Sequence, residues 1–216
     1  MKELSKAREL AEVLVQLGKD AGVKTSALLT DMSTPLGLKV GNALEVEESV
    51  EVLAGGGPAD VVEITVALAT EMLTLAGKPD ADVAAALKDG RAMDKWRAMI
   101  SAQGGDPDAK LPVAAESQTI KAASSGVITK LDALSVGLAS WRLGAGRARK
   151  EDPIQFGAGV TLHAQLGDTV KAGDPLYTLH TDEPARFQRA AETIENAYSI
   201  EAQAVVARKL ILDRIS

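Results

Sequence analysis

Hydrophobic positions recur at helical spacing in the first half of the chain. In residues 4–17, apolar side chains fall every three or four positions with charged residues between them, which predicts an amphipathic helix. Residues 61–76 are apolar almost all round, which is typical of a buried helix. Further helices are expected from Asn42, where Glu45 follows at capping-box spacing, at 81–89, and at 91–103 with Met93, Trp96 and Ile100 on its core face.

One convincing strand precedes residue 110. Residues 25–30 read as a short, mostly buried strand that Asp31 closes, and a turn around Pro35 and Gly37 follows. A helix followed by a buried strand predicts part of an α/β sheet. Because one strand is not a sheet, we expect its neighbours to be missing or to come from another chain.

The pattern changes beyond residues 104–117, where turn formers predict a linker. Short alternating stretches separated by Gly-Asp turns then predict strands at 119–122, 126–130, 161–164 and 175–180. Helices are expected at 131–142 and at 184–198, the second with Phe187, Ala191, Ile194 and Tyr198 on one face. The apolar and basic tail at 202–215 predicts no definite element.

Composition narrows the function. The net charge is −6 and no long basic run is present, which argues against nucleic acid, because phosphate binding needs several Lys or Arg. No run of about 18 apolar residues occurs, so we expect no membrane partner and a cytoplasmic protein. The absence of cysteine excludes disulfide bonds and thiolate metal sites.

Three features invite a binding or catalytic function, and each also has a plainer interpretation. The glycine run at 55–58 is expected to be a loop, because no strand precedes it and no Lys-Ser/Thr follows. The stretch GAGRARK at 144–150 could form an anion nest, although we favour a charged loop after a helix. His163 and His180 lie in predicted strands, where structural positions are favoured over catalysis.

Five segments carry a family resemblance when they are taken in order. They are ALLTDMSTPLG at 27–37, VGNALEVEESV at 40–50, SAQGG at 101–105, LGAGRARKEDPI at 143–154 and GDTVKAGDPL at 167–176. Together they resemble the C-terminal half of the thymidine and pyrimidine-nucleoside phosphorylases, over nearly the whole chain. The resemblance implies an α/β remnant, with helices around an incomplete sheet, at 1–105 and a linker at 106–117. An α+β, β-rich domain of barrel-sandwich type is expected at 118–200, with a tail at 201–216.

The resemblance also implies an activity. Such enzymes are cytoplasmic homodimers that split thymidine or uridine with phosphate into free base and pentose 1-phosphate, without an organic cofactor. Their Lys-His-Ser-Thr-Gly-Gly segment and base-contacting residues lie before the matched region, and this chain has no Lys-His pair. We therefore expect no catalytic or substrate-binding residue here and no activity of the chain alone.

The start of the chain matches an internal stretch of the family. Met1 and Lys2 fall where family members run through a Gly-Ala-Phe-Met-Lys-like sequence. A truncated reading frame, a split gene or a recombinant fragment would each produce such a start. The expected partner is a missing N-terminal half or a further copy in a homo-oligomer.

One binding site of the family is implied in part. Some members hold a monovalent cation, such as potassium, with two backbone carbonyls after the Pro-Leu-Gly turn and a glutamate on the next helix. The matching positions are Leu36, Lys39 and Glu48, and oxygen ligands of this kind suit a hard cation. The remaining ligands belong to the missing half. For Glu48, a solvated carboxylate on the helix surface is the alternative.

Two other functions stay open. The chain could be a non-catalytic remnant, either inert or acting as an interaction module. The region at 166–182 also resembles the half-barrel of biotinyl and lipoyl carriers. Such carriers need a modifiable lysine at an exposed hairpin tip, and neither Lys130 nor Lys171 has that setting, so a shared architecture without attachment chemistry is favoured.

Overall fold

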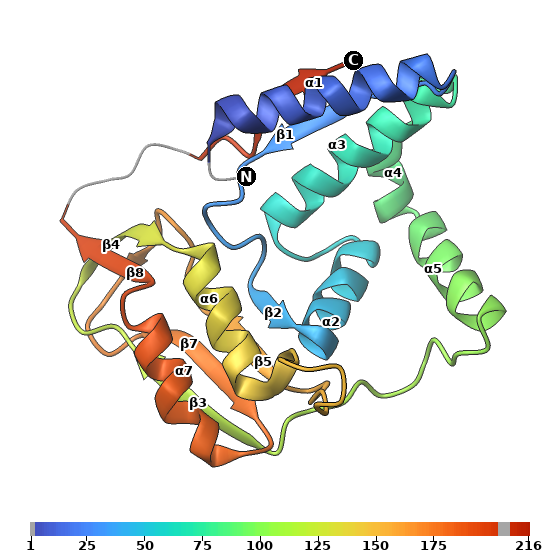
Figure 1. Cartoon of the computed structure of the whole chain (residues 1–216). Coiled ribbons are helices and arrows are strands. Elements are labelled where there is room, and N and C mark those ends of the chain that lie inside the picture. Colours follow the sequence, from blue (N-terminus) through green and yellow to red (C-terminus); the bar gives the residue numbers. More distant parts are fainter. Residues whose placement is uncertain (1–2, 203–207) are drawn as a thin grey trace.

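The structure is a computed structural model that describes residues 3–202 and 208–216. Within these residues the chain has a mixed α/β fold with seven α-helices and nine strands in three open sheets (Figure 1). The helices are α1 (Leu4–Asp20), α2 (Asn42–Leu53), α3 (Ala59–Leu75), α4 (Val83–Lys88), α5 (Arg91–Ala102), α6 (Ala133–Ser140) and α7 (Phe187–Ile194). The strands are β1 (Ala27–Thr30), β2 (Lys39–Gly41), β3 (Glu116–Lys121), β4 (Gly126–Leu131), β5 (Gly159–Leu162), β6 (Thr169–Val170), β7 (Pro175–Thr181), β8 (Tyr198–Glu201) and β9 (Ile211–Ile215).

The helices of the first half are where periodicity predicts them, but α3 is less covered than expected. The predicted helices α1, α4 and α5 are confirmed. The expectation that 61–76 is a buried helix is wrong, because α3 has no buried residue and Met72 is 70% exposed. On α5, the predicted core face is only half-buried. Among the described residues, too few elements surround these helices to cover an apolar surface on every side.

β1 has a partner that local sequence does not reveal. β9, from the C-terminal tail, pairs with it antiparallel, with Leu28 opposite Arg214 and Ala27 opposite Ile215. The prediction that all neighbours of this strand are missing or come from another chain is therefore wrong for one edge. The strand is also less buried than expected, because Leu29 is its only buried residue. Of the predicted tail, residues 203–207 lie outside the described residues.

A second strand, β2, also precedes residue 110 and corrects the prediction of a single strand there. It opens the four-stranded sheet β2-β5-β7-β3, with Lys39 opposite Thr161 and Gly41 opposite Gly159. A Cβ on Gly41 would lie 2.4 Å from the carbonyl oxygen of Ala158, so only glycine allows this approach. Three residues are too short to show a period of two, which explains why sequence alone misses β2.

The main core lies in the second half of the chain, where α6 and α7 pack beside the strands (Figure 1). The predicted strands at 126–130, 161–164 and 175–180 are confirmed within two residues, and β4 belongs to a third sheet, β6-β4-β8. The largest fully buried side chains of the described residues all lie in this half of the chain. They are Tyr177, Ile128, Leu143, Leu162, Leu179, Ile194, Val136, Val160 and Thr181. None of the helices in the described ranges is long and apolar enough to cross a membrane.

The last predicted helix is shorter than expected. Instead of continuing to residue 198, α7 ends at Ile194, and Tyr198 opens β8 opposite Leu131 of β4. The helical pattern at Tyr198 is therefore overridden by strand pairing, since the edge of β4 offers backbone hydrogen bonds to this segment.

Candidate functional site

The turn between β1 and β2 is held by two acidic side chains. The backbone N–H of Leu38 donates to Oε1 of Glu48 at 2.8 Å, and that of Gly37 donates to Oδ2 of Asp60 at 3.0 Å. Glu48 comes from α2, and Asp60 from the first turn of α3. The fold thus brings two carboxylates from different helices against one turn.

Glu48 is a buried carboxylate rather than a solvated one. It is only 6% exposed, so the alternative of a solvated surface carboxylate is wrong. Burial raises its pKa; the N–H of Leu38 and the charge of Lys39 oppose that rise, while the charge of Asp60 adds to it. A Cβ on Gly37 would lie 2.1 Å from Oε2 of Glu48, and φ at Gly37 is +70°, so the turn needs glycine at this position.

Lys39 turns its side chain toward other acids on α2. Its Nζ lies 2.9 Å from both Glu47 Oε2 and Glu51 Oε1. Burial opposes the change, but these two hydrogen bonds raise the pKa of Lys39 above its ordinary value. The ammonium is therefore paired, and the role that the resemblance gives to Lys39 would fall to its backbone carbonyl alone.

The residues expected to hold a cation come from one short segment and one helix. Leu36 is 40% exposed beside Pro35, while Glu48 is buried beneath the turn. Together with the carbonyl of Lys39 they would offer oxygen donors only, which is the donor chemistry of a hard cation. In residues 3–202 and 208–216, no group of three or more His, Cys, Asp or Glu could hold a metal ion by side chains alone.

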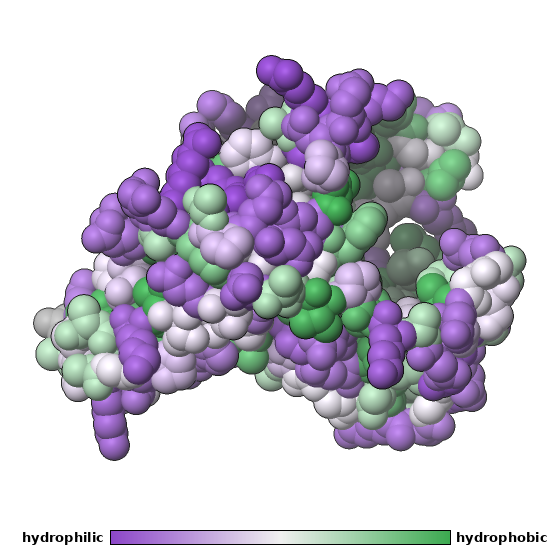
Figure 2. Space-filling view, turned by 90° about the horizontal axis from the view of Figure 1, so that it is seen from below, coloured by the Kyte–Doolittle hydropathy of each residue, from purple (hydrophilic) through white to green (hydrophobic). Residues whose placement is uncertain are grey.

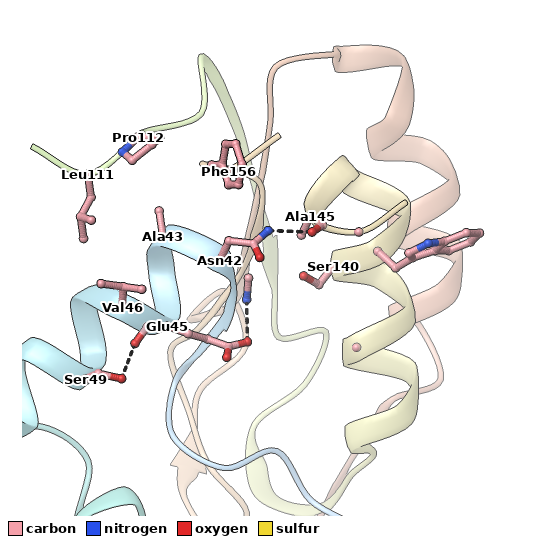
Figure 3. A pocket seen from close by; sticks show the side chains of 14 residues that line it. Asn42, Ala43, Glu45, Val46, Ser49, Leu111, Pro112, Ser140, Ala145 and Phe156 are labelled. Carbon is pink, nitrogen blue, oxygen red and sulfur yellow. Dashed lines mark hydrogen bonds between the residues drawn. The ribbon is translucent and has the colours of Figure 1, made fainter. Parts of the chain in front are cut away.

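A cavity of about 680 Å³ lies where α2 meets the end of α6 (Figure 3). The Nδ2 of Asn42 donates to the carbonyl of Ala145 at 2.7 Å, and the N–H of Gly41 donates to Oε1 of Glu45 at 3.1 Å. The predicted capping box is thus wrong for Asn42, because Gly41 is the N-cap and the Asn42 amide reaches the other half of the chain. The Asn42 amide therefore ties the two halves together, while the bond from Gly41 to Glu45 stays within the first half. Neither bond pairs a nucleophile with a base.

The stretch at 144–150 is a charged loop, as favoured. It follows a π-helical turn at Trp141–Ala145 in which Gly144 has φ +111°. The residues at 147–150 are exposed, and Nη1 of Arg147 donates to the carbonyl of Lys150 at 3.0 Å. Glycine allows the positive φ at the kink, and the cationic side chains beyond it face solvent.

The two histidines occupy structural positions on the sheet. Nε2 of His163 lies 2.7 Å from Oγ1 of Thr178, and Nε2 of His180 lies 3.0 Å from Oγ1 of Thr161. Burial lowers the pKa of His180, and the nearby His163 lowers it further. Each imidazole therefore pairs with a hydroxyl on the neighbouring strand, as expected for a structural residue.

Sequence reasoning missed two residues that contact the turn. Asp60 shows only as an acid in the first turn of a helix, which is ordinary. Arg208 binds Asp31 with Nε 2.7 Å from Oδ2, although 177 residues separate them. No local signal could have found this pair, since its two members share no element.

The chain is similar to known proteins along its whole length. The family model of the pyrimidine nucleoside phosphorylase C-terminal domain matches residues 127–201. A thymidine phosphorylase of Mycobacterium tuberculosis (strain CDC 1551 / Oshkosh) is 51% identical over 215 residues, which cover 100% of this chain and 50% of that protein. Pyrimidine-nucleoside phosphorylases of Bacillus subtilis (strain 168) and Geobacillus stearothermophilus are each 38% identical, covering 92% and 100% of this chain and 47% and 52% of their own. The chain spans about half the length of the curated relatives it matches.

Proposed function

We propose that this chain, which belongs to the thymidine and pyrimidine-nucleoside phosphorylase family and matches its C-terminal half, works as the C-terminal portion of a phosphorolytic enzyme. The enzyme would cleave thymidine or uridine with phosphate into free base and pentose 1-phosphate. The similarity to the Mycobacterium tuberculosis thymidine phosphorylase, 51% over the full chain, carries the proposal. We further propose a cytoplasmic location, phosphate as co-substrate and no organic cofactor.

The uncovered apolar surface of the helical part supports a partner for this chain. Leu14 and Leu17 on α1 and Met72 on α3 are each more than half exposed. Figure 2 shows apolar residues around a hollow on the side where Figure 1 places α3 to α5. Surfaces of this kind mark interaction sites in soluble proteins. We propose that an N-terminal half of the enzyme packs there, in an assembly that is a homo-oligomer of complete enzyme units.

We also propose that Leu36, Lys39 and Glu48 supply part of a potassium site, through two backbone carbonyls and one carboxylate. The buried position of Glu48 beneath the turn supports this assignment. The domain division at 1–105, 106–117, 118–200 and 201–216, and the barrel-sandwich type of the β-rich part, belong to the same proposal.

Complementation tests the proposed function. The chain would be purified from a host that lacks its own thymidine and uridine phosphorylases, alone and together with a separately expressed N-terminal half of the Mycobacterium tuberculosis relative. Thymine release from thymidine would be followed by chromatography, with and without phosphate. We expect background turnover from either half and phosphate-dependent turnover from the pair, because removing even one charge-stabilising donor costs ~10²–10³ in rate.

Two outcomes would count against the proposal. Turnover by this chain alone would show that the catalytic groups have been placed in the wrong half. A stable complex of the two halves without any turnover would favour the non-catalytic interaction module instead.

A further inference from the structure

We propose that Arg208 is a positioning residue for the turn between β1 and β2, holding the turn's carbonyl groups in the orientation that the adjacent cation-binding positions require. The cation itself rests on the proposed function. The hydrogen bonds from Arg208 to the turn do not rest on the proposed function, because they are contacts within this chain.

The guanidinium of Arg208 makes four contacts with the turn. Its Nε donates to Oδ2 of Asp31 at 2.7 Å, and its Nη2 donates to the carbonyl of Asp31 at 2.9 Å and that of Thr34 at 3.2 Å. Its Nη1 donates to the carbonyl of Pro35 at 3.3 Å. The side chains of Arg208 and Asp31 are only 17% and 20% exposed, so water competes weakly for these bonds. One planar cation thus fixes three carbonyls and one carboxylate together.

The carboxylate in this cluster is set up to stay ionised. Partial burial opposes ionisation, but hydrogen bonds from the N–H and Oγ of Ser33, together with that from Arg208, lower the pKa of Asp31. A charged carboxylate and a guanidinium form a stronger hydrogen bond than neutral groups do. The contact is therefore present throughout the neutral pH range.

The other side of the turn is held by anions. The N–H of Gly37 is bound by Asp60 and that of Leu38 by Glu48, whereas the carbonyls at residues 31–35 are bound by Arg208. The hydrogen bonds from Arg208 and those to the two carboxylates fall on either side of Leu36. Arg208 orients the peptide unit between Pro35 and Leu36, and Asp60 orients the next one.

This arrangement fixes the direction of the Leu36 carbonyl. A trans peptide unit is planar, so its C=O points opposite to its N–H. Because the N–H of Gly37 points at Asp60, the carbonyl of Leu36 is directed away from that carboxylate. Leu36 is one of the positions proposed to bind the cation. Arg208 fixes the preceding peptide unit, between Pro35 and Leu36, with a guanidinium that carries five N–H donors, whereas a lysine ammonium has only three donors for the same four acceptors.

The test compares Arg208→Met and Arg208→Lys with Arg214→Met in the complete chain. Arg214 is a matched control because it lies in the same tail and binds Glu71, away from the turn. NMR would record the amide signals of Gly37 and Leu38 in each variant. For the affinity, potassium chloride would be titrated against tetramethylammonium chloride at constant ionic strength with the N-terminal half of the Mycobacterium tuberculosis relative bound, because that half supplies the remaining ligands. We expect both Arg208 variants to move the two signals and to weaken potassium binding ~10-fold or more, as for residues that orient metal ligands. Arg214→Met should leave the signals and the affinity unchanged.

Further variants keep the result decisive if an Arg208 variant does not fold. Asp31→Asn removes the charged acceptor while the tail stays intact, and it should move the same two signals. In Arg208→Ala, millimolar guanidinium should return them toward the native positions, and tetramethylammonium should not. Native Gly37 and Leu38 signals in folded Arg208→Met, or in Asp31→Asn, would overturn the inference. If potassium moves neither signal in the wild-type chain bound to the N-terminal half, while the Arg208 variants move both, the cation proposal is refuted and the positioning role is retained.

Discussion

The backbone N–H of Leu38 donates to Oε1 of Glu48 at 2.8 Å, which joins the end of the turn to the middle of α2. Burial raises the pKa of Glu48 above its unfolded value. The folded state therefore binds a proton more tightly than the unfolded state does. The stabilisation from this protonation is fully present below the unfolded pKa and is lost as the pH rises through the folded pKa.

Glu48→Gln should raise thermal stability at neutral pH in tetramethylammonium chloride by roughly 1 kcal/mol. The amide removes the buried charge and still offers an oxygen to Leu38. The gain should shrink as the pH falls through the pKa of Glu48, because the wild-type carboxyl then becomes neutral. Circular dichroism melts from acid to neutral pH would measure this, with Glu63→Gln as the control because Glu63 is exposed on α3. A gain in stability that does not change with pH would contradict the raised pKa of Glu48 in the folded state.

Potassium should reverse the effect of Glu48→Gln once the N-terminal half is bound. The isolated chain should bind potassium only weakly, because the remaining ligands belong to that half. In the complex, a bound cation would compensate the carboxylate charge, so the glutamine variant should melt lower than wild type in potassium chloride. Melting curves of the complex in potassium and tetramethylammonium salts test this. Equal shifts in both salts would remove Glu48 from the cation site.

Thr181→Val should destabilise the β-rich half by ~1–3 kcal/mol. Thr181 is fully buried, and its Oγ1 donates to the carbonyl of Leu143 at 2.7 Å. Valine keeps the shape but leaves that carbonyl unsatisfied inside the core. Thr178→Val is the matched control on the same strand, because its hydroxyl lies on the more open face beside His163. Urea unfolding midpoints would measure the stability of both variants. Similar losses of stability in Thr181→Val and Thr178→Val would show that the buried hydrogen bond contributes no more than the exposed one.

Gly159→Ala should weaken the junction between the two halves by roughly 1–3 kcal/mol. A Cβ on Gly159 would lie 2.3 Å from the carbonyl oxygen of Val40, so β2 must move away from β5. Gly137→Ala is the control, because its Cβ would meet nothing within 4 Å and alanine suits the interior of a helix. Thermal melts of the two variants should move in opposite directions. A neutral Gly159→Ala would show that β2 tolerates displacement.

The isolated chain should self-associate or partly unfold within residues 1–60. β1 is paired with β9 on one edge only in the described part of the chain, and α1 and α3 expose apolar side chains. By contrast, the core at residues 118–184 should stay protected. Hydrogen exchange with light scattering measures both, and removal of residues 211–216 should increase scattering by freeing the second edge of β1. A stable monomer with equal protection at residues 27–30 and in β7 would contradict this.

Local sequence was sufficient wherever one element carries its own signal. The period of α1 predicts a helix and the alternation in β7 predicts a strand, and both elements follow from the pattern alone. In β7 the alternation also marks the core face, whereas Leu14 and Leu17 of α1 are more than half exposed. The five ordered segments were likewise enough for the family. The same reasoning overestimated the burial of α3, because a fully apolar helix reveals that it must be covered but not by which element.

What the sequence by itself determined is the local elements and the family. What only the tertiary structure decided is the pairing of β1 with β9, the entry of β2 into the second sheet, the burial of Glu48 and the grip of Arg208 on the turn. The pairings and the grip join residues more than 100 positions apart, and the burial of Glu48 depends on how the turn folds over α2. Local periodicity records only which way a side chain faces within its own element, so it carries no information about which distant partner it meets.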